Sequence, residues 1–228
     1  MKHIRIDEQG DEEVMLYVEG ALPEVPAGSV RVRVEAIGVN MIDIYQRSGQ
    51  YKMALPFTPG QEAAGVVDAV GDGVSDFQIG DRVAYPFALG AYAEYAVVPA
   101  AKLVPLPAGV SSRIAAAVLL QGMTAHYLLT DTYRVGSSDS VLIHAAAGGT
   151  GQLLVQIAKL KGARVLATTS TEEKRRSPAQ PGRMSWCCTV TSRRWSRRRR
   201  AGAASMSSTT RSAGTRSSAA WVACARAG

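Results

Sequence analysis

Cysteine is absent from residues 1–176, and acidic residues are absent from residues 177–228. Without cysteine, residues 1–176 have neither a disulfide framework nor a thiolate metal site. The cysteines of the chain, Cys187, Cys188 and Cys224, follow no spacing typical of a metal motif. No run of about 18 apolar residues predicts a membrane span, and the N-terminus lacks the apolar core of a signal peptide. We therefore expect a cytoplasmic protein.

Residues 177–228 differ from the rest of the chain in composition. They contain ten Arg, ten Ser, ten Ala and every Trp, and no Leu, Ile, Phe, Tyr, Lys, His, Asn, Asp or Glu. The net charge of +7 is therefore an average over two unlike parts. Residues 1–176 carry 16 Lys and Arg against 19 Asp and Glu, so this part has no basic excess that would favour nucleic acid.

A small β-rich domain is predicted first. Residues 30–37 alternate apolar and charged side chains, which is the period of a half-buried strand. Further short strands are predicted at 64–70, 82–85 and 92–98, separated by turns that contain Gly and Asp. The pattern is clear over roughly residues 1–110, and we assign residues 1–120 to this domain.

The periodicity then becomes that of an α/β domain. Ser111 and Ser112 can cap a helix from about residue 113 to 119, and a second helical segment is expected at 124–129. A βαβ unit is predicted next. It consists of an apolar strand at 141–146, a glycine loop, a helix that ends at Gly162 and a second strand at 163–170. The predicted fold class is α/β.

The loop Ala145-Ala146-Ala147-Gly148-Gly149-Thr150-Gly151 joins the strand of this unit to its helix. Glycines let phosphates approach the backbone, and a helix N-terminus offers free N–H groups. We predict that residues 148–151 hold the pyrophosphate of a dinucleotide; a glycine-rich turn without a ligand is the alternative. Ser170 and Lys174 favour the 2′-phosphate of NADPH over NADH, unless they belong to an ordinary solvated helix start.

Five motifs, in one order along the chain, carry a resemblance to a known family. They are Gly38-Val39-Asn40-Met41-Ile42-Asp43, the segment 59–67, Gly80-Asp81-Arg82-Val83, Leu120-Gln121-Gly122-Met123-Thr124-Ala125 and the Ala-Ala-Gly-Gly-Thr-Gly loop. Over residues 1–176 the chain resembles the zinc-independent medium-chain dehydrogenase/reductases, specifically the zeta-crystallin-like NADPH:quinone oxidoreductases. The resemblance implies a GroES-like catalytic domain at 1–120 and, at 121–176, the first part of a Rossmann domain that binds NADPH.

The resemblance also implies the site residues. Those expected near the nicotinamide and substrate, as catalytic residues, are Asn40, Asp43, Tyr45 and Tyr51. The cofactor-binding set is Gln121, Thr124, Gly148, Gly149, Thr150, Gly151, Ser170 and Lys174. An amide and a hydroxyl suit the carboxamide or ribose of the cofactor, and tyrosines suit a flat acceptor. For Asp43 and Tyr45, capping and packing after a strand is the alternative.

No metal site is predicted. Asn40 stands where zinc-bearing relatives have a Cys, and Gln61 stands where they have a His before Glu62. Without a Lewis acid, the expected acceptors are already electrophilic, such as quinones or enones. The predicted activity is hydride transfer from NADPH to such an acceptor, and a non-catalytic, crystallin-like binding protein is the alternative.

Residues 177–228 allow two interpretations. The arginines at 193–200 could contact nucleic acid. We favour a single-base frameshift near codon 176, because in the shifted frame Trp186-Cys187-Cys188-Thr189 must read Val, Leu and then Tyr or His, as a Rossmann strand would. On this hypothesis the sheet ends after two strands, and the homodimer typical of the family is doubtful. We then expect poor folding beyond the first domain and little activity.

Overall fold

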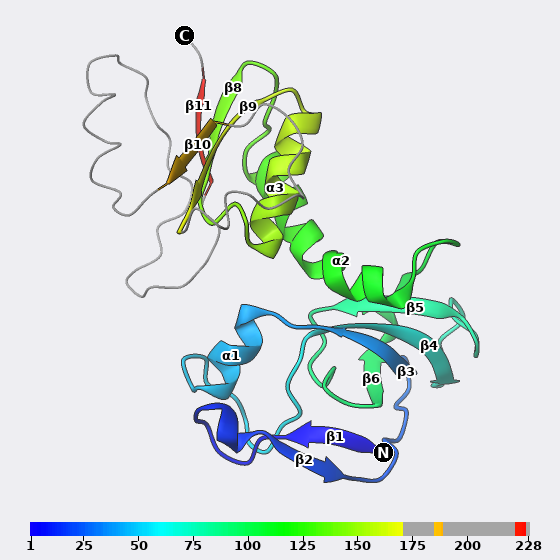
Figure 1. The fold of residues 1–228 in the computed structure, drawn as a ribbon. Helices are drawn as coiled ribbons and strands as arrows, with labels where there is room; N and C mark the ends of the chain where they lie inside the picture. Colours follow the sequence, from blue (N-terminus) through cyan, green and yellow to red (C-terminus); the bar gives the residue numbers. More distant parts are fainter. Residues whose placement is uncertain (171–184, 189–221, 227–228) are drawn as a thin grey trace. The chain divides into compact units, whose positions relative to one another are not determined.

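The computed structural model of the chain describes residues 1–170, 185–188 and 222–226 (Figure 1). The chain divides into two compact units, Met1–Leu120 and Gln121–Gly228, and each has its own buried hydrophobic core. Within the described residues, no helix combines the length and the apolar character needed to cross a membrane.

The first unit is built on a five-stranded antiparallel sheet with strand order β6-β3-β4-β5-β7. Its strands are β3 (Ser29–Gly38), β4 (Glu62–Val70), β5 (Arg82–Pro86), β6 (Tyr95–Pro99) and β7 (Val104–Pro105). In β3, Val30 and Val32 are fully buried. The alternating residues Arg31 and Arg33 are not buried. The alternation that predicted this strand therefore corresponds to its two faces.

Short elements complete the first unit. They are the antiparallel pair β1 (Lys2–Arg5) and β2 (Leu16–Glu19), the helix α1 (Met41–Arg47), and the 3₁₀ turns Glu12–Val14 and Ala100–Lys102. Tyr85 is fully buried in the core with valines from β3, β4, β5 and β6. This core supports the end of β3, where the chain turns at Asn40 into α1.

The second unit begins within α2 (Ser112–Tyr127), which continues as a π-helical turn at Leu128–Thr132. The amide of Ile114 donates to Ser111 Oγ (3.3 Å), so the predicted serine cap is confirmed. The prediction of two separate helical segments is wrong, because α2 runs through Gly122 without a break. A glycine inside a helix costs only about 1 kcal/mol, which the packing of Ala115, Ala116 and Ala125 offsets.

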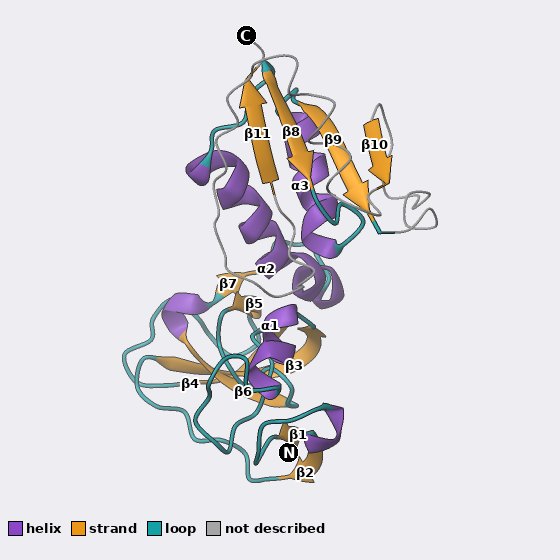
Figure 2. Ribbon diagram, turned by 90° about the vertical axis from the view of Figure 1, so that its left-hand side faces the viewer, coloured by secondary structure: helices purple, strands orange, loops and turns teal. Residues whose placement is uncertain are grey.

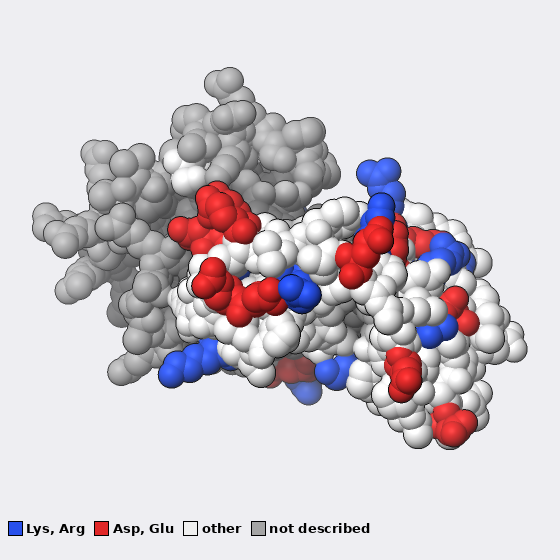
Figure 3. Space-filling view, turned by 90° about the horizontal axis from the view of Figure 1, so that it is seen from below, with Lys and Arg blue, Asp and Glu red and all other residues white. Residues whose placement is uncertain are grey.

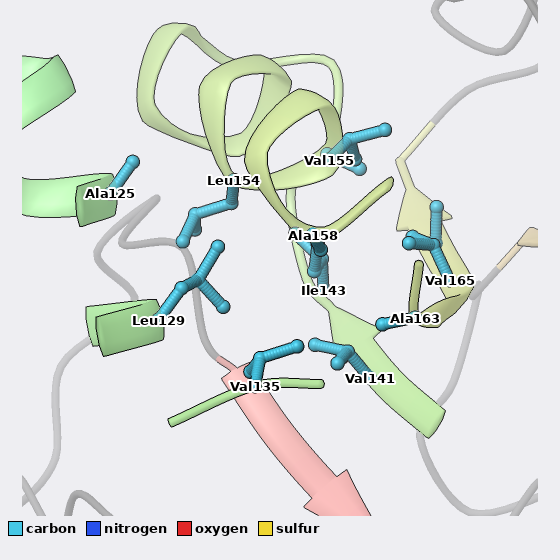
Figure 4. Packing of buried hydrophobic residues seen from close by; sticks show 12 residues of the cluster. Ala125, Leu129, Val135, Val141, Ile143, Leu154, Val155, Ala158, Ala163 and Val165 are labelled. Atoms are coloured by element: carbon cyan, nitrogen blue, oxygen red, sulfur yellow. The ribbon is translucent and has the colours of Figure 1, made fainter. Parts of the chain in front are cut away.

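The βαβ unit consists of β8 (Asp139–Ile143), α3 (Gly149–Leu160) and β9 (Arg164–Thr169), with β8 and β9 parallel. α3 packs against both strands and buries Leu154, Val155 and Ala158 in a core that also contains Leu129 and Ile143 (Figure 4). The predicted helix and second strand are confirmed. The first strand ends three residues earlier than predicted because Ala145 has a positive φ of 50°, which no strand allows.

Four strands form the sheet of the second unit, in the order β10-β9-β8-β11 (Figure 2). β10 (Ser185–Cys188) runs parallel to β9, and β11 (Val222–Arg226) runs antiparallel to β8. The expectation of a sheet that ends after two strands is therefore wrong. The edges of β8 and β9 offer backbone N–H and C=O groups, and the largely apolar segments Val222–Arg226 and Ser185–Cys188 pair with them.

Candidate functional site

A buried polar cluster surrounds the start of α1 in the first unit. Asp43 Oδ2 accepts the backbone N–H of Asn40 (2.8 Å) and the hydroxyl of Tyr92 (3.0 Å). The first of these bonds is the carboxylate half of a capping box, so Asp43 fixes the point at which the chain leaves β3 and enters the helix. Capping, the alternative interpretation of Asp43, is therefore what this side chain does in the structure.

Glu62 connects this cluster to α2. Its side chain is completely buried at the first position of β4. Oε2 accepts Asn40 Nδ2 (2.8 Å), and Oε1 accepts the backbone N–H of Leu120 (2.7 Å). Gly38 makes room for this carboxylate, because a Cβ at Gly38 would overlap Glu62 Oε2 and the carbonyl oxygen of Ala116. Glycine is therefore required here by the close approach of three chain segments.

The electrostatics of the cluster follow from its burial. Burial raises the pKa of Asp43 above its usual value, although the hydrogen bonds from Asn40 and Tyr92 lower it. Burial also raises the pKa of Glu62, against the Asn40 and Leu120 donors, and the charge of Asp43 raises it further. The pKa of Tyr92 is raised by burial and by Asp43. Burial therefore opposes ionisation of both acids, the donors from Asn40, Tyr92 and Leu120 favour it, and the Tyr92 hydroxyl is held as a donor.

Tyr45 and Tyr51 lie together next to this cluster. Their rings meet edge to face, with centroids 5.6 Å apart, and the N–H of Tyr51 donates to the carbonyl of Tyr45 (2.9 Å). Tyr45 is partly buried on α1, whereas Tyr51 is about half exposed, at 51%. The four residues predicted as catalytic, 40, 43, 45 and 51, are thus brought together around α1.

The glycine loop of the second unit has the geometry of a helix N-terminus that is open to solvent. Gly148 and Gly149 are exposed, and the first N–H of α3 that bonds back within the helix is that of Gln152, to Gly148 O (2.9 Å). The amides of residues 149–151 come before that bond, so they are the ones that an anion could use. Gly151 is buried, and a Cβ there would overlap the carbonyl oxygen of Ala145.

The other predicted cofactor residues are placed as follows. The amide of Gln121 packs directly on Gly149, where any Cβ would overlap its Oε1. Thr124 lies one helical turn further along α2 and is partly buried, and Ser170 is exposed just after β9. Lys174 lies outside the described residues. Gln121 and Gly149 are thus brought together within the second unit.

One further polar pair lies at the carboxyl ends of the two central strands. His144 Nδ1 lies 2.9 Å from Thr168 Oγ1, and burial lowers the pKa of this histidine. Thr168 also accepts the N–H of Ala146 through its carbonyl oxygen (3.0 Å). These contacts hold the start of the glycine loop against β9, so His144, the first residue after β8, has a structural role.

Charge on the described surface is mixed. In the view of Figure 3, acidic and basic side chains are interspersed over the described residues. Within this part of the chain, His, Cys, Asp and Glu form no group of three or more that could hold a metal ion. The arginines at 193–200, on which the nucleic-acid interpretation depends, lie outside the described residues.

Glu62 and Tyr92 belong to the site, but sequence reasoning did not include them. A single Glu before the apolar run Ala63-Ala64 was a signal, because a carboxylate in a buried strand must find partners. The partners themselves come from segments 22 and 58 residues away. Only the fold could identify them.

Comparison with known proteins agrees with this architecture. Residues 26–108 match the alcohol dehydrogenase GroES-like domain. The chain is 45% identical over 183 residues to the quinone oxidoreductase of Pseudomonas aeruginosa, covering 79% of this chain and 56% of the relative. It is 41% identical over 180 residues to a probable quinone oxidoreductase of Schizosaccharomyces pombe, covering 78% and 55%.

A solved structure extends the similarity to both units. The Escherichia coli quinone oxidoreductase complexed with NADPH aligns with a TM-score of 0.77 at 41% identity, covering 81% of this chain and 58% of that one. The chain spans about half the length of the curated relatives it matches. The motifs, the sheet of the first unit and these identities lead to one conclusion: over about four fifths of its length this chain is similar to quinone oxidoreductases, with a GroES-like domain at residues 26–108 and an α/β fold.

Proposed function

We propose that this chain is built for hydride transfer from NADPH to a quinone or a related enone. The observation that carries the proposal is the exposed pair Gly148 and Gly149 at the start of α3, followed by the amides of residues 149–151, which precede the first hydrogen bond of the helix. The NADPH complex of the Escherichia coli relative supports the choice of cofactor. We assign residues 1–120 to the catalytic domain, 121–176 to the first part of the cofactor domain, and 177–228 to an out-of-frame segment.

Each part of the cofactor has a proposed partner. Gly149, Thr150 and Gly151 hold the pyrophosphate through backbone amides, which are the groups a helix N-terminus offers to an anion, and Gly148, whose own N–H bonds to Ala145 O (2.8 Å), lets the phosphates approach the loop. Ser170 and Lys174 hold the 2′-phosphate. Gln121, which packs on Gly149, and Thr124 border the same bound molecule. The cradle fits an anion, because two of its glycines are exposed and a side chain at Gly151 would displace the loop.

The residues around α1 serve the acceptor. Bound NADPH supplies the hydride. Tyr45 and Tyr51 offer apolar ring faces and hydroxyl groups to a flat acceptor, and Asn40 orients the reacting rings. Asp43 fixes the start of α1 and holds the Tyr92 hydroxyl, so its contribution is to position Asn40. We also propose a cytoplasmic location, and we do not extend the homodimer typical of the family to this chain.

The experiment compares two substitutions at one exposed position. Gly148 is the N-cap of α3 with extended backbone angles, so Asp and Asn are both good caps there. Gly148→Asp places a carboxylate beside the pyrophosphate and should weaken NADPH binding by about tenfold or more through charge repulsion. Gly148→Asn has the same shape and the same cap contact with the first amides of α3 but no charge, so it should bind NADPH more tightly than Gly148→Asp. NADPH binding is measured by fluorescence titration, and equal affinity of the two variants would refute the assigned pyrophosphate site.

A further inference from the structure

The orientation of the Asn40 amide is set by its neighbours. Nδ2 donates to Glu62 Oε2 (2.8 Å), and its other hydrogen is directed to the carbonyl oxygen of Gly38 (3.4 Å). In the capping box at the start of α1, the Asn40 side chain faces the N–H of Asp43, which is the place of an acceptor atom. Both ends of the amide therefore require the same orientation, with Nδ2 toward Glu62.

Glu62 cannot relax this requirement. It is fully buried, and its second oxygen accepts the N–H of Leu120 on α2. The two donors approach different oxygens, which suits a carboxylate that offers acceptors on both sides. Gly38 packs directly on Oε2, so the carboxylate has no room to turn away. The hydrogens of the Asn40 amide are thus both used within the protein, and the remaining hydrogen-bonding capacity is the lone pair of Oδ1 that does not face the Asp43 N–H.

We propose that Glu62 is a positioning residue that makes Asn40 a hydrogen-bond acceptor toward its ligand. Asn40 then recognises an N–H or O–H group and does not donate to the carbonyl oxygen of a quinone. In the proposed function, on which this inference rests, such a group is the carboxamide N–H of the cofactor or the hydroxyl of a quinol. Donation to the reduced oxygen must come from another group.

The sequence provides a direct test, because Asn40 is the only asparagine in the chain. Labelling the full chain with ¹⁵N-asparagine gives one side-chain NH₂ group in an NMR spectrum. In the free wild-type protein at neutral pH, we expect one of its protons to be shifted downfield by the Glu62 carboxylate and to exchange with water about tenfold or more slowly than a free amide. Two protons with the shifts and exchange of a free amide would overturn the proposal.

Two variants separate positioning from general loosening of the cluster. In Glu62→Gln, the side-chain oxygen must still accept the Leu120 N–H, so its NH₂ faces Asn40 and forces that amide to turn over. The downfield proton should then be lost. Tyr92→Phe removes a different hydrogen bond of the same cluster, to Asp43, and should leave the Asn40 resonances in place. Equal changes in both variants would overturn the proposal.

The ligand is identified with paired probes that differ in one donor group. NADP⁺ carries the carboxamide NH₂, and its 3-acetylpyridine analogue does not; hydroquinone carries hydroxyls, and its dimethyl ether does not. A shift of the Asn40 resonance with NADP⁺ alone identifies the carboxamide, and a shift with hydroquinone alone identifies the quinol. Equal shifts within each pair would overturn donor recognition. Binding of none of the probes would overturn the proposed function and its ligand, whereas the free-protein spectrum decides the role of Glu62 separately.

Discussion

Three glycines of the second unit differ in what surrounds them, which makes glycine-to-alanine substitution a graded test of the structure. A Cβ at Gly122 in α2 would meet nothing within 4 Å. At Gly149 it would overlap the end of the Gln121 side chain, which can rotate away. At Gly151 it would overlap the carbonyl oxygen of Ala145 and lie 2.8 Å from Ala146 Cα, and neither backbone atom can move without the loop.

The expected changes in unfolding free energy follow from these contacts. Gly122→Ala should stabilise the chain by about 0.5–1 kcal/mol, because alanine is the better helix former and fits without strain. Gly149→Ala should change little, since the same gain offsets the displacement of Gln121. Gly151→Ala should lower the free energy of unfolding by about 1–2 kcal/mol. Overpacking against the backbone costs about 1–3 kcal/mol, and the higher helix propensity of alanine offsets at most about 1 kcal/mol of this.

The order of the three variants is measured by urea unfolding followed by far-ultraviolet circular dichroism. The midpoints should increase from Gly151→Ala through Gly149→Ala to Gly122→Ala, with similar slopes. A midpoint for Gly151→Ala equal to that of Gly122→Ala would refute the placement of the glycine loop against Ala145. A low midpoint for Gly149→Ala as well would show that Gln121 is held in place and cannot rotate.

Of three further predictions, two concern single side chains and one concerns the gene. Tyr92→Phe removes the donor to Asp43 and should lower the free energy of unfolding by about 1–2 kcal/mol. Tyr85→Phe should be neutral or stabilising, because the buried Tyr85 hydroxyl has no partner among the described residues. Urea unfolding compares the two variants, and equal losses of stability would contradict the Tyr92–Asp43 hydrogen bond. Because burial lowers the pKa of His144, stability should fall as the pH drops below about 6.5, and His144→Gln should flatten this dependence in pH-dependent unfolding. Restoring one base near codon 176 should open a long reading frame, and a gene sequence without such a frame would reject the frameshift.

The strands of the first unit were predictable where one face is buried. Residues 30–37 alternate because β3 has the core on one side, and the prediction matched it to within a residue or so at either end. α1 was not predicted as a helix, because its seven residues are too few for a 3.6-residue period to show. The start of α1 depends on the bond from the Asn40 N–H to the Asp43 carboxylate, which can be recognised only in the folded structure.

The polar site was harder to predict than the strands because its contacts are distant in sequence. The motifs around Asn40, Gln121 and the glycine loop pointed to three segments through resemblance, and their roles stay a prediction. The Asn40–Glu62–Leu120 connection joins three such segments through two hydrogen bonds, and neither composition nor periodicity contains that information. Burial of a carboxylate was the only local signal, and it indicates that partners exist without naming them.

The direction of β11 has a consequence for the cofactor site. In a doubly wound sheet, ligands bind at the carboxyl ends of parallel strands, where the strand order reverses. β8, β9 and β10 are parallel, so their carboxyl ends lie on the side of the glycine loop. β11 is antiparallel to β8 and brings its amino end to that side, starting at Val222 opposite Ile143. Within the described residues, the strand beside β8 on this side is therefore not parallel to it and presents its amino end to the glycine loop, so we expect the pyrophosphate to be bound through α3 without contacts from the carboxyl end of β11.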